Sequence, residues 1–491
     1  MTTLFSCRLD AAPTPLRHPW QHTVGSCHAP TALRADWQAQ LRRARTELGF
    51  RHVRFHGILC DDMGTLICQS DQLLYSFFNT DQIFDFLLSI GMKPVVELSF
   101  MPSTLASGGT TVFHYRANVT PPRDYAQWGD LIFKLVSHWV ERYGVDEVAQ
   151  WPFEVWNEPN LEAFWTGGKD AYFKLYQTTA EAIKRVDSRL QVGGPATAQN
   201  AWIDDFLAYC AAHQLPADFV STHFYPTDAF GEIGADTVTQ LEHAPLDVMH
   251  DRAVQARAQA GARPLYYTEW NVTSNPRDSL HDQSFSAALA VRIALGVDAV
   301  VDAYSYWTFS DIFEENYFPS VPFHGGFGLL NLHGIAKPIY RAFQFMLQLG
   351  DHTLPVEGSH PSVALWVGQQ DADSAAATTV LLINQAMPRH PIGVENVQVH
   401  LSGGADRRPT RITITRIDED HCNPARAWQE MGAPEYLNAA ALEKIRLSSL
   451  PVPTDHSFVE QGGVIVLDVS MPPQSLALLS IEWSAHDRSK N

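Results

Sequence analysis

From about residue 20 to residue 345, short apolar segments alternate with longer amphipathic segments. The short segments are rich in β-branched residues, as buried strands are, and the longer ones repeat apolar positions at helical spacing. Strand patterns lie at residues 22–27, 52–57, 93–100, 152–159, 190–197, 218–225, 264–271 and 302–310. The clearest helical patterns lie at residues 36–50, 125–144, 170–187 and 338–350. This alternation predicts βαβ units and a parallel sheet.

Eight strands with crossovers, closed by a last helix, predict an α/β fold: a (β/α)8 TIM barrel over residues 16–348. The alternative is a doubly wound open sheet. Such a sheet normally carries a glycine-rich phosphate loop after its first strand. The segment after His22 holds no GxGxxG motif, so the barrel is favoured.

From about residue 350 the pattern changes to short strands with turn residues between them and little helical signal. These strands are expected at residues 364–370, 378–385, 397–403, 411–418, 463–469 and 475–483. The pattern predicts an antiparallel β-sandwich, an accessory domain at residues 349–491. We expect residues 1–15 to add a strand to it.

The formal net charge of the chain is −19. A surface this acidic repels phosphate backbones and anionic lipid, so we expect neither a nucleic-acid nor a membrane partner. Aromatic residues make up 11% of the chain. Sugar-binding enzymes use aromatic faces as stacking platforms, but large barrels also bury many aromatic residues, so this fraction leaves both interpretations open.

Six cysteines are scattered without a CxxC pair, which indicates neither a zinc knuckle nor a disulfide framework. The N-terminal segment lacks the basic and apolar regions of a secretory signal. No segment approaches the roughly 20 apolar residues of a membrane span. We therefore expect a cytoplasmic protein.

Catalytic groups of a TIM barrel sit at the C-terminal ends of its strands. The predicted strands end in polar or aromatic residues, namely Arg54, His56, Glu97, Ser99, Asn157, Glu158, His223, Tyr225, Glu269, Asn271 and Trp307. Two of these carboxyl groups, Glu158 on the fourth strand and Glu269 on the seventh, would face each other across the barrel mouth. An active site is therefore expected there.

Glycoside hydrolysis needs one protonated carboxyl group and one ionised carboxylate. Glu158 and Glu269 supply this pair, and Asn157 beside Glu158 is suited to hold a sugar 2-hydroxyl. Taken alone, each glutamate has the alternative of a structural salt bridge. Sequence spacing also leaves open whether the carboxyl groups lie about 5 Å apart, as in retaining enzymes, or further, as in inverting ones.

Several long segments resemble glycoside hydrolase family 39, the family of bacterial β-xylosidases and α-L-iduronidases. They are FEVWNEPNLEAFW, DFVSTHFY, YYTEWN, SYWTFSDIFEE, FHGGFGLL and HVRFHGILCDDMG. The match covers nearly the whole barrel. It implies a retaining (β/α)8-barrel enzyme with an acid/base on strand four and a nucleophile on strand seven.

The resemblance implies a role for each catalytic position. Glu158 resembles the acid/base, Glu269 the nucleophile and Asn157 the ligand of the 2-hydroxyl. Tyr225 resembles the residue that orients Glu269, and His223 one that lines the sugar subsite.

The resemblance also implies substrate-binding residues. His56 resembles a ligand of a sugar hydroxyl, Trp307 a stacking floor, and Phe113 an apolar wall. One of Glu314 and Glu315 is expected to bind the 3- or 4-hydroxyl of a terminal pentopyranose, and the sequence leaves open which one.

Two residues depart from the family pattern. Phe224 stands where a small residue is expected, and Trp270 stands where a smaller aromatic residue is as common. Both are expected near the substrate, where they bear on sugar specificity.

No HExxH motif is present, and His114, His324 and His333 are not spaced as metal ligands. We therefore expect no metal and no cofactor. The leading hypothesis is a retaining exo-β-xylosidase that releases xylose from xylo-oligosaccharides, with a small oligosaccharide as its ligand. Linkage preference and oligomeric state stay open.

The alternatives are an α-L-arabinosidase or other exo-glycosidase of the same family, and a carbohydrate-binding barrel without catalysis. An iduronidase would need a basic residue for the sugar carboxylate, for which Arg54 is the candidate. An endo-glycanase would need an open cleft, which an insert at about residues 101–140 is expected to close.

Overall fold

The computed structural model describes residues 2–70, 72–229, 236–315, 317–369, 377–403 and 408–484. Eight parallel strands close into a barrel. In chain order they are β3 (Thr23–His28), β4 (His52–His56), β7 (Lys93–Leu98), β10 (Pro152–Val155), β11 (Gln191–Thr197), β12 (Phe219–His223), β13 (Leu265–Trp270) and β14 (Ala303–Tyr306). The predicted TIM barrel is confirmed.

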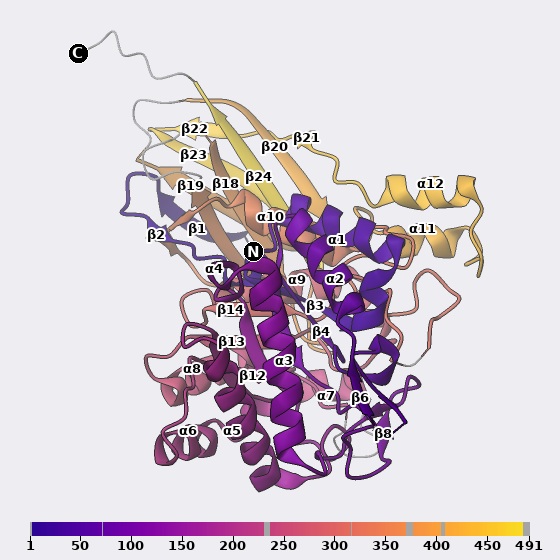
Figure 1. Cartoon of the computed structure of the whole chain (residues 1–491). Helices are drawn as coiled ribbons and strands as arrows, with labels where there is room; N and C mark the ends of the chain where they lie inside the picture. The colour runs from indigo at the N-terminus through magenta and orange to yellow at the C-terminus, as the bar shows by residue number, and fades with distance from the viewer. Residues whose placement is uncertain are drawn as a thin grey trace.

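Helices surround the barrel (Figure 1). The principal ones are α1 (Ala35–Leu48), α2 (Phe78–Ser89), α3 (Tyr125–Tyr143), α5 (Gly168–Val186), α6 (Ile203–Ala212), α8 (Val248–Ala260), α9 (Ser284–Gly296) and α10 (Pro338–Gln348). Helix α3 shows why they form here. The Asp124 side chain accepts a hydrogen bond from Ala126 N at its start, and Gly144 follows its end with φ 85°. Its buried side, which includes Trp128, Leu135 and Trp139, faces the core.

The insert after β7 is shorter than the predicted 101–140, because residues from Tyr125 onward belong to α3. The loop at residues 99–124 forms a small hairpin of β8 (Thr111–Val112) and β9 (Ala117–Asn118). A second hairpin, β5 (Leu66–Gln69) with β6 (Gln72–Tyr75), follows β4.

Two further sheets form the sandwich around a shared apolar core. One consists of β16 (Val356–Glu357), β1 (Thr2–Arg8), β19 (Glu395–Ser402), β23 (Val464–Met471) and β22 (Val459–Gln461). The other consists of β2 (Thr14–Pro15), β15 (His352–Leu354), β17 (Val363–Gln369), β18 (Ala377–Asn384), β24 (Ser475–Trp483), β20 (Pro409–Ile417) and β21 (Thr454–Asp455).

The N-terminal segment joins this sandwich, as Figure 1 shows for the indigo strand β1 beside the later strands. Strand β1 runs parallel to β19, whereas the other pairs in the two sheets are antiparallel within the described residues. The expected antiparallel sandwich therefore contains one parallel pair. Since β1 comes from the far end of the chain, no hairpin fixes its direction. Met1 and residues 485–491 of the expected accessory domain lie outside the described residues.

Two helices that sequence patterns missed, α11 (Pro424–Glu430) and α12 (Ala439–Ser448), extend from the sandwich. Both have an asparagine cap, Asn423 and Asn438, whose side chain accepts a hydrogen bond from a first-turn N–H. They pack against Phe323 of the loop that follows β14. Among the described residues, none of the helices combines the length and apolar character that crossing a bilayer demands.

Candidate active site

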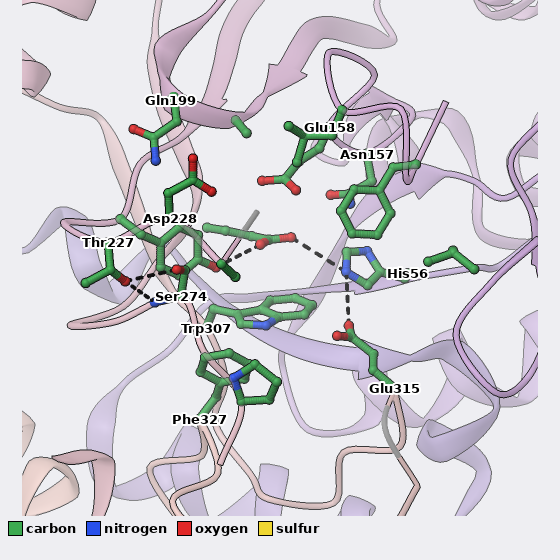
Figure 2. A pocket seen from close by; sticks show the side chains of 18 of the residues that line it. His56, Asn157, Glu158, Gln199, Thr227, Asp228, Ser274, Trp307, Glu315 and Phe327 are labelled. Atoms are coloured by element: carbon green, nitrogen blue, oxygen red, sulfur yellow. Dashed lines mark hydrogen bonds and ion pairs between the residues drawn. The ribbon is translucent and has the colours of Figure 1, made fainter. Parts of the chain in front are cut away.

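A cavity of about 390 Å³ opens at the C-terminal mouth of the barrel. Figure 2 shows its labelled side chains, with His56 and Glu315 on one side and Gln199, Thr227 and Asp228 across from them. Its lining comprises His56, Val112, Phe113, Asn157, Glu158, Leu161, Phe164, Ala198, Gln199, Tyr225, Thr227, Asp228, Ala229, Glu269, Ser274, Pro276, Trp307, Glu315 and Phe327. Most of the expected site residues therefore come together here.

The end of β10 places Glu158 at this mouth. The backbone turns sharply after Val155, since Trp156 and Glu158 adopt φ values of 73° and 45°. Backbone strain of this kind in non-glycine residues concentrates at functional sites. The Glu158 N–H donates to the Ala196 carbonyl at 2.8 Å, which ties the turn to β11.

Glu269 lies within β13 and is held by two donors. Its Oε1 accepts a hydrogen bond from Arg54 Nη1 at 2.7 Å, and its Oε2 accepts one from Tyr225 Oη at 2.9 Å. The hydrogen bond from Arg54 is also an ion pair, which fixes the position of the carboxylate. Tyr225 therefore lies where the family resemblance expects it, against Glu269.

The two carboxyl groups lie close together. One carboxylate oxygen of Glu158, one carboxylate oxygen of Glu269 and one ring nitrogen of His223 all lie within 4.8 Å of one another. Retaining glycosidases place the two groups about 5 to 5.5 Å apart, and inverting enzymes leave about 6.5 to 9.5 Å for a water. The two nearest oxygens thus approach as closely as a retaining enzyme requires.

Arg54 organises the layer beneath the pocket. Its guanidinium group is fully buried and also donates to Glu154 Oε2 at 2.5 Å and to Asn157 Oδ1 at 3.0 Å, and it pairs with Glu97 at 2.9 Å. Although burial lowers the Arg54 pKa, the charges of Glu154, Glu97 and Glu269 outweigh it and raise that pKa. Arg54 is thus engaged by the protein's own carboxylates and does not line the cavity, so it is wrong as a candidate for a sugar carboxylate.

The environment of Glu158 favours its neutral form. Burial raises the pKa of Glu158 to about 7, with His56 and Arg54 acting in the opposite direction. Burial lowers the pKa of His223 to about 4, so this ring is neutral near pH 7. His223 Nδ1 lies 2.9 Å from Glu158 Oε1. One carboxyl group therefore retains its proton while the other is paired with a cation.

Glu315, and not Glu314, faces the cavity. The Glu314 carboxylate points away and pairs with His28 Nδ1 at 2.6 Å. Glu315 Oε1 lies 3.7 Å from His56 Nε2. The other ring nitrogen of His56, Nδ1, forms a 2.7 Å hydrogen bond with Glu97. Burial raises the pKa of Glu315 to about 8. Glu315 therefore presents a protonated carboxyl group at neutral pH.

Aromatic side chains form the apolar surfaces of the cavity. Trp307 packs with Phe327 and Tyr225, and Phe113 at the hairpin tip packs against Phe164, with ring centroids 5.6 Å apart. Gly25 on β3 makes room for the Trp307 ring, because a Cβ there would lie 2.5 Å from Trp307 Cε3. Both aromatic residues line the cavity as expected.

Three expectations from the sequence are corrected by these positions. His223 does not line the sugar subsite; it is fully buried behind Glu158. Phe224 and Trp270 do not line the cavity either. Trp270 stacks on Tyr304 in the barrel wall, with centroids 4.5 Å apart. Neither departure from the family pattern touches the cavity.

Sequence reasoning missed two residues beneath Glu158 and Glu269, namely Glu154 and Thr268. It also missed the residues at the rim of the cavity, namely Gln199, Thr227 and Asp228. The signal for the first two was a polar residue inside an otherwise apolar strand, in PFEV and LYYTEW. Thr227 and Asp228 lie in a loop and Gln199 in a single 3-10 turn (Ala198–Asn200), so no periodic pattern marks these rim residues.

Two groups of potential metal ligands come within 4.8 Å of one another among the described residues: His28 with Cys60 and Asp62, and the catalytic cluster itself. His28 already lies between Glu314 and Asp62, and the cluster around Glu158 is occupied by its own hydrogen bonds. The expectation of no metal and no cofactor stays a prediction.

A TIM barrel that brings a proton-bearing carboxyl group and a cation-paired carboxylate together in one cavity defines a glycoside hydrolase of the retaining type. The family model described as Glycosyl hydrolases family 39 matches residues 6–464, and the chain belongs to that family. The expected family resemblance is confirmed.

Similar proteins span the same length. A β-xylosidase of Caldicellulosiruptor saccharolyticus is 46% identical over 94% of this chain and 95% of its own. A β-xylosidase of Geobacillus stearothermophilus is 38% identical over 94% of this chain and 92% of its own. The crystal structure of a monomeric β-xylosidase from Caulobacter crescentus CB15 superimposes with a TM-score of 0.84 at 33% identity, covering 98% of this chain and 99% of that one.

Proposed function

We propose that this chain is a retaining exo-β-xylosidase in which Glu158 is the acid/base and Glu269 the nucleophile. The observation that carries the proposal is the contrast between two neighbouring carboxyl groups. Glu269 is paired with Arg54, whereas burial holds the pKa of Glu158 at about 7. The two full-length relatives named above are β-xylosidases.

In the first step, a Glu269 oxygen attacks the anomeric carbon from one face of the sugar. The bond to the leaving oxygen breaks as Glu158 transfers its proton to that oxygen. The product of this step is a covalent glycosyl-enzyme. Tyr225 and Arg54 hold Glu269 for the attack, since each donates to a different oxygen of its carboxylate.

In the second step, Glu158 as carboxylate removes a proton from water. The hydroxide attacks the anomeric carbon, and the bond to Glu269 breaks. Two inversions give net retention. Glu158 ends the cycle protonated and Glu269 ends it as a carboxylate, so both groups are ready for the next substrate.

The remaining residues form the terminal sugar subsite in this proposal. Asn157 Oδ1 accepts a hydrogen bond from Arg54, so Asn157 Nδ2 is the group that can donate to the 2-hydroxyl. His56 and the protonated Glu315 are suited to the other ring hydroxyls. Trp307 supplies the floor and Phe113 the apolar wall. The hairpin that carries Phe113 closes one side of the cavity, which supports action at chain ends.

A substrate panel tests the activity. Aryl β-xyloside, aryl α-L-arabinoside and polymeric xylan are assayed side by side. We expect the highest kcat/KM on the β-xyloside and little release from xylan. A preference for the arabinoside would overturn the sugar assignment, and efficient internal cleavage of xylan would overturn the exo assignment.

Azide separates the two carboxyl roles. With an aryl xyloside whose phenol is very acidic, Glu158→Ala is expected to glycosylate and then deglycosylate slowly, and azide should speed turnover to the β-azide. Glu269→Ala is expected to be inactive without azide and to give the α-azide with it. NMR of the products reads the configuration. An α-azide from Glu158→Ala would reverse the assignment.

The proposal includes a cytoplasmic location, supported by six cysteines that are all free thiols, the state that reducing compartments maintain. It also includes a catalytic barrel at residues 16–348 and an accessory sandwich at 349–491 with residues 1–15. The last barrel helix ends at Gln348 and the first strand after it begins at His352, which supports this boundary. Cell fractionation and limited proteolysis test these two points.

A further inference from the structure

A chain of hydrogen bonds runs from the buried ion pair beneath the pocket to Glu158. It begins at Glu154, whose Oε2 accepts from Arg54 Nε at 2.5 Å. Both side chains are fully buried. A carboxylate that forms an ion pair with a guanidinium only accepts hydrogen bonds. Every polar hydrogen that faces Glu154 therefore belongs to its partner.

The second link is Thr268 on β13. Its Oγ1 lies 2.7 Å from Glu154 Oε1, so the hydroxyl donates its single hydrogen to Glu154. The same oxygen lies 3.1 Å from His223 Nε2. Because the only hydrogen of the hydroxyl is donated to Glu154, the Thr268 oxygen can only accept from His223. His223 Nε2 therefore carries the hydrogen of that contact.

The third link is His223, which is fully buried and neutral near pH 7. A neutral imidazole carries one hydrogen. With that hydrogen on Nε2, Nδ1 presents a lone pair to Glu158 Oε1 at 2.9 Å. The hydrogen between these two atoms therefore comes from the carboxyl group.

We infer that Thr268 is a positioning residue for the general acid: it fixes the His223 tautomer that accepts, and thereby keeps Glu158 protonated in the free enzyme. The inference rests on the proposed role of Glu158. When Glu158 ionises, its oxygen faces the Nδ1 lone pair, which disfavours the charged form. The same repulsion makes Glu158 a stronger base toward water in the second step.

Other charged groups also act on Glu158, and they do not replace this effect. They come from β4, β7, β13 and the loops after β12 and β14, and are Arg54, His56, Glu97, Glu269, Asp228 and Glu315. All of them persist when Thr268 is changed. A matched pair of variants at position 268 therefore isolates the hydroxyl.

Thr268→Val keeps the shape of the side chain and removes its hydroxyl. The His223 tautomer with its hydrogen on Nδ1 then becomes the favoured one, because Nδ1–H donates a hydrogen bond to ionised Glu158. The pH profile of kcat/KM reports the free enzyme. Its basic limb is expected to shift to lower pH by about one pH unit. Thr268→Ser retains the hydroxyl and is expected to keep the wild-type limb.

Leaving groups separate positioning from general damage. At pH 7, kcat/KM of Thr268→Val is expected to fall several-fold on an aryl xyloside whose phenol is a poor leaving group. On the dinitrophenyl xyloside kcat/KM should fall little, because the dinitrophenolate leaves without a proton. Equal losses on both substrates, or an unmoved basic limb, would overturn the inference.

The tautomer is also measurable without turnover. Long-range nitrogen–proton NMR of the wild-type protein labelled at histidine, with His223→Gln to assign the signals, reports which ring nitrogen carries the hydrogen. We expect Nε2. A hydrogen on Nδ1 in the free enzyme would overturn the inference even if Thr268→Val failed to fold. Absence of xylosidase activity in the wild type would overturn the proposed function and leave this result intact.

Discussion

One buried cation gives the two glutamates at the barrel mouth different properties. Arg54 donates to Glu269 and Glu154 and pairs with Glu97, so it stabilises charge on Glu269 and on the layer below. Glu158 faces a neutral imidazole across 2.9 Å. Two chemically identical side chains a few ångströms apart thereby have different partners, a cation for Glu269 and a neutral ring for Glu158, and double displacement uses such a difference.

At this scale, the pH dependence of catalysis follows from Glu158. Its pKa of about 7 predicts that kcat/KM falls as pH rises through that value, because the acid loses its proton. A pH series on an aryl xyloside with a poor leaving group measures this limb. Glu158→Gln is expected to remove the limb along with nearly all activity on that substrate. Should a limb near pH 7 persist in the variant, another group is the acid.

Glu315 predicts a pH-dependent effect on stability. Its folded pKa is about 8 and an unfolded glutamate titrates near about 4.3, so between these values the folded state binds one more proton. Wild-type stability then falls as pH rises through this window. Glu315→Gln lacks this penalty, so it is expected to be more stable than the wild type by on the order of a few kcal/mol near pH 8.

Thermal unfolding of both proteins at pH 5 and pH 8 measures the Glu315 effect. The gap in Tm should be much narrower at pH 5, which lies only about 0.7 pH unit above the pKa of an unfolded glutamate, than at pH 8. A gap that is the same at both values would contradict a raised pKa. The variant is also expected to lose activity, since the proposed subsite uses Glu315.

At the scale of elements, the barrel was predictable because each strand is an apolar run with a polar end. The same feature located Glu158 and Glu269. Helices α11 and α12 were not predicted, since their helical pattern is short and their asparagine caps lie among other turn residues. Which of Glu314 and Glu315 faces the cavity depends on the fold of a loop that packs against His28, and no local pattern encodes that contact.

The buried layer was only partly predictable, for a related reason. Arg54, Glu97 and Glu154 each sit inside an apolar strand, where a charge signals either a partner or a site. Their mutual pairing follows from the closure of the barrel, which brings β4, β7 and β10 side by side. Sequence reasoning named Arg54 and Glu97 among the strand ends but overlooked Glu154, which lies inside β10.

Gly25 on strand β3 lies directly behind Trp307, the proposed floor of the sugar subsite. Gly25→Ala would place a methyl group 2.5 Å from Trp307 Cε3 and 3.1 Å from the Tyr306 carbonyl, so the indole must shift toward the cavity. We expect kcat/KM on an aryl β-xyloside to fall by about tenfold or more, with fluorescence reporting the moved tryptophan. Gly296→Ala, where a Cβ meets nothing within 4 Å, is the matched control and should keep full activity. Unchanged kinetics in Gly25→Ala would show that the floor does not bind substrate.

At the scale of the whole molecule, one sheet of the sandwich is buried on both faces. Along β24, Leu476 and Leu478 pack into the core shared with the barrel, while Ala477, Leu479 and Ile481 pack into the sandwich core. Strand β18 alternates in the same way and, like β24, contacts helix α9. This double burial explains why both strands are nearly continuous apolar runs in the sequence. It also means that the sandwich covers apolar surface of the barrel.

Barrel and sandwich are therefore expected to unfold together. Leu478 is 1% exposed and lies in the core that joins the two. Leu478→Ala should lower the free energy of unfolding by about 2 to 5 kcal/mol while kcat/KM below the transition stays near the wild-type value. Leu479→Ala, one position along and facing the sandwich core, is the matched comparison.

Calorimetry, with activity measured along the same temperature ramp, shows how many unfolding transitions each variant has and at which one activity is lost. If the two parts form one cooperative unit, each variant shows a single transition at which activity disappears. A variant that loses the sandwich in a first transition and keeps xylosidase activity until a second would show that the barrel is stable without its cover.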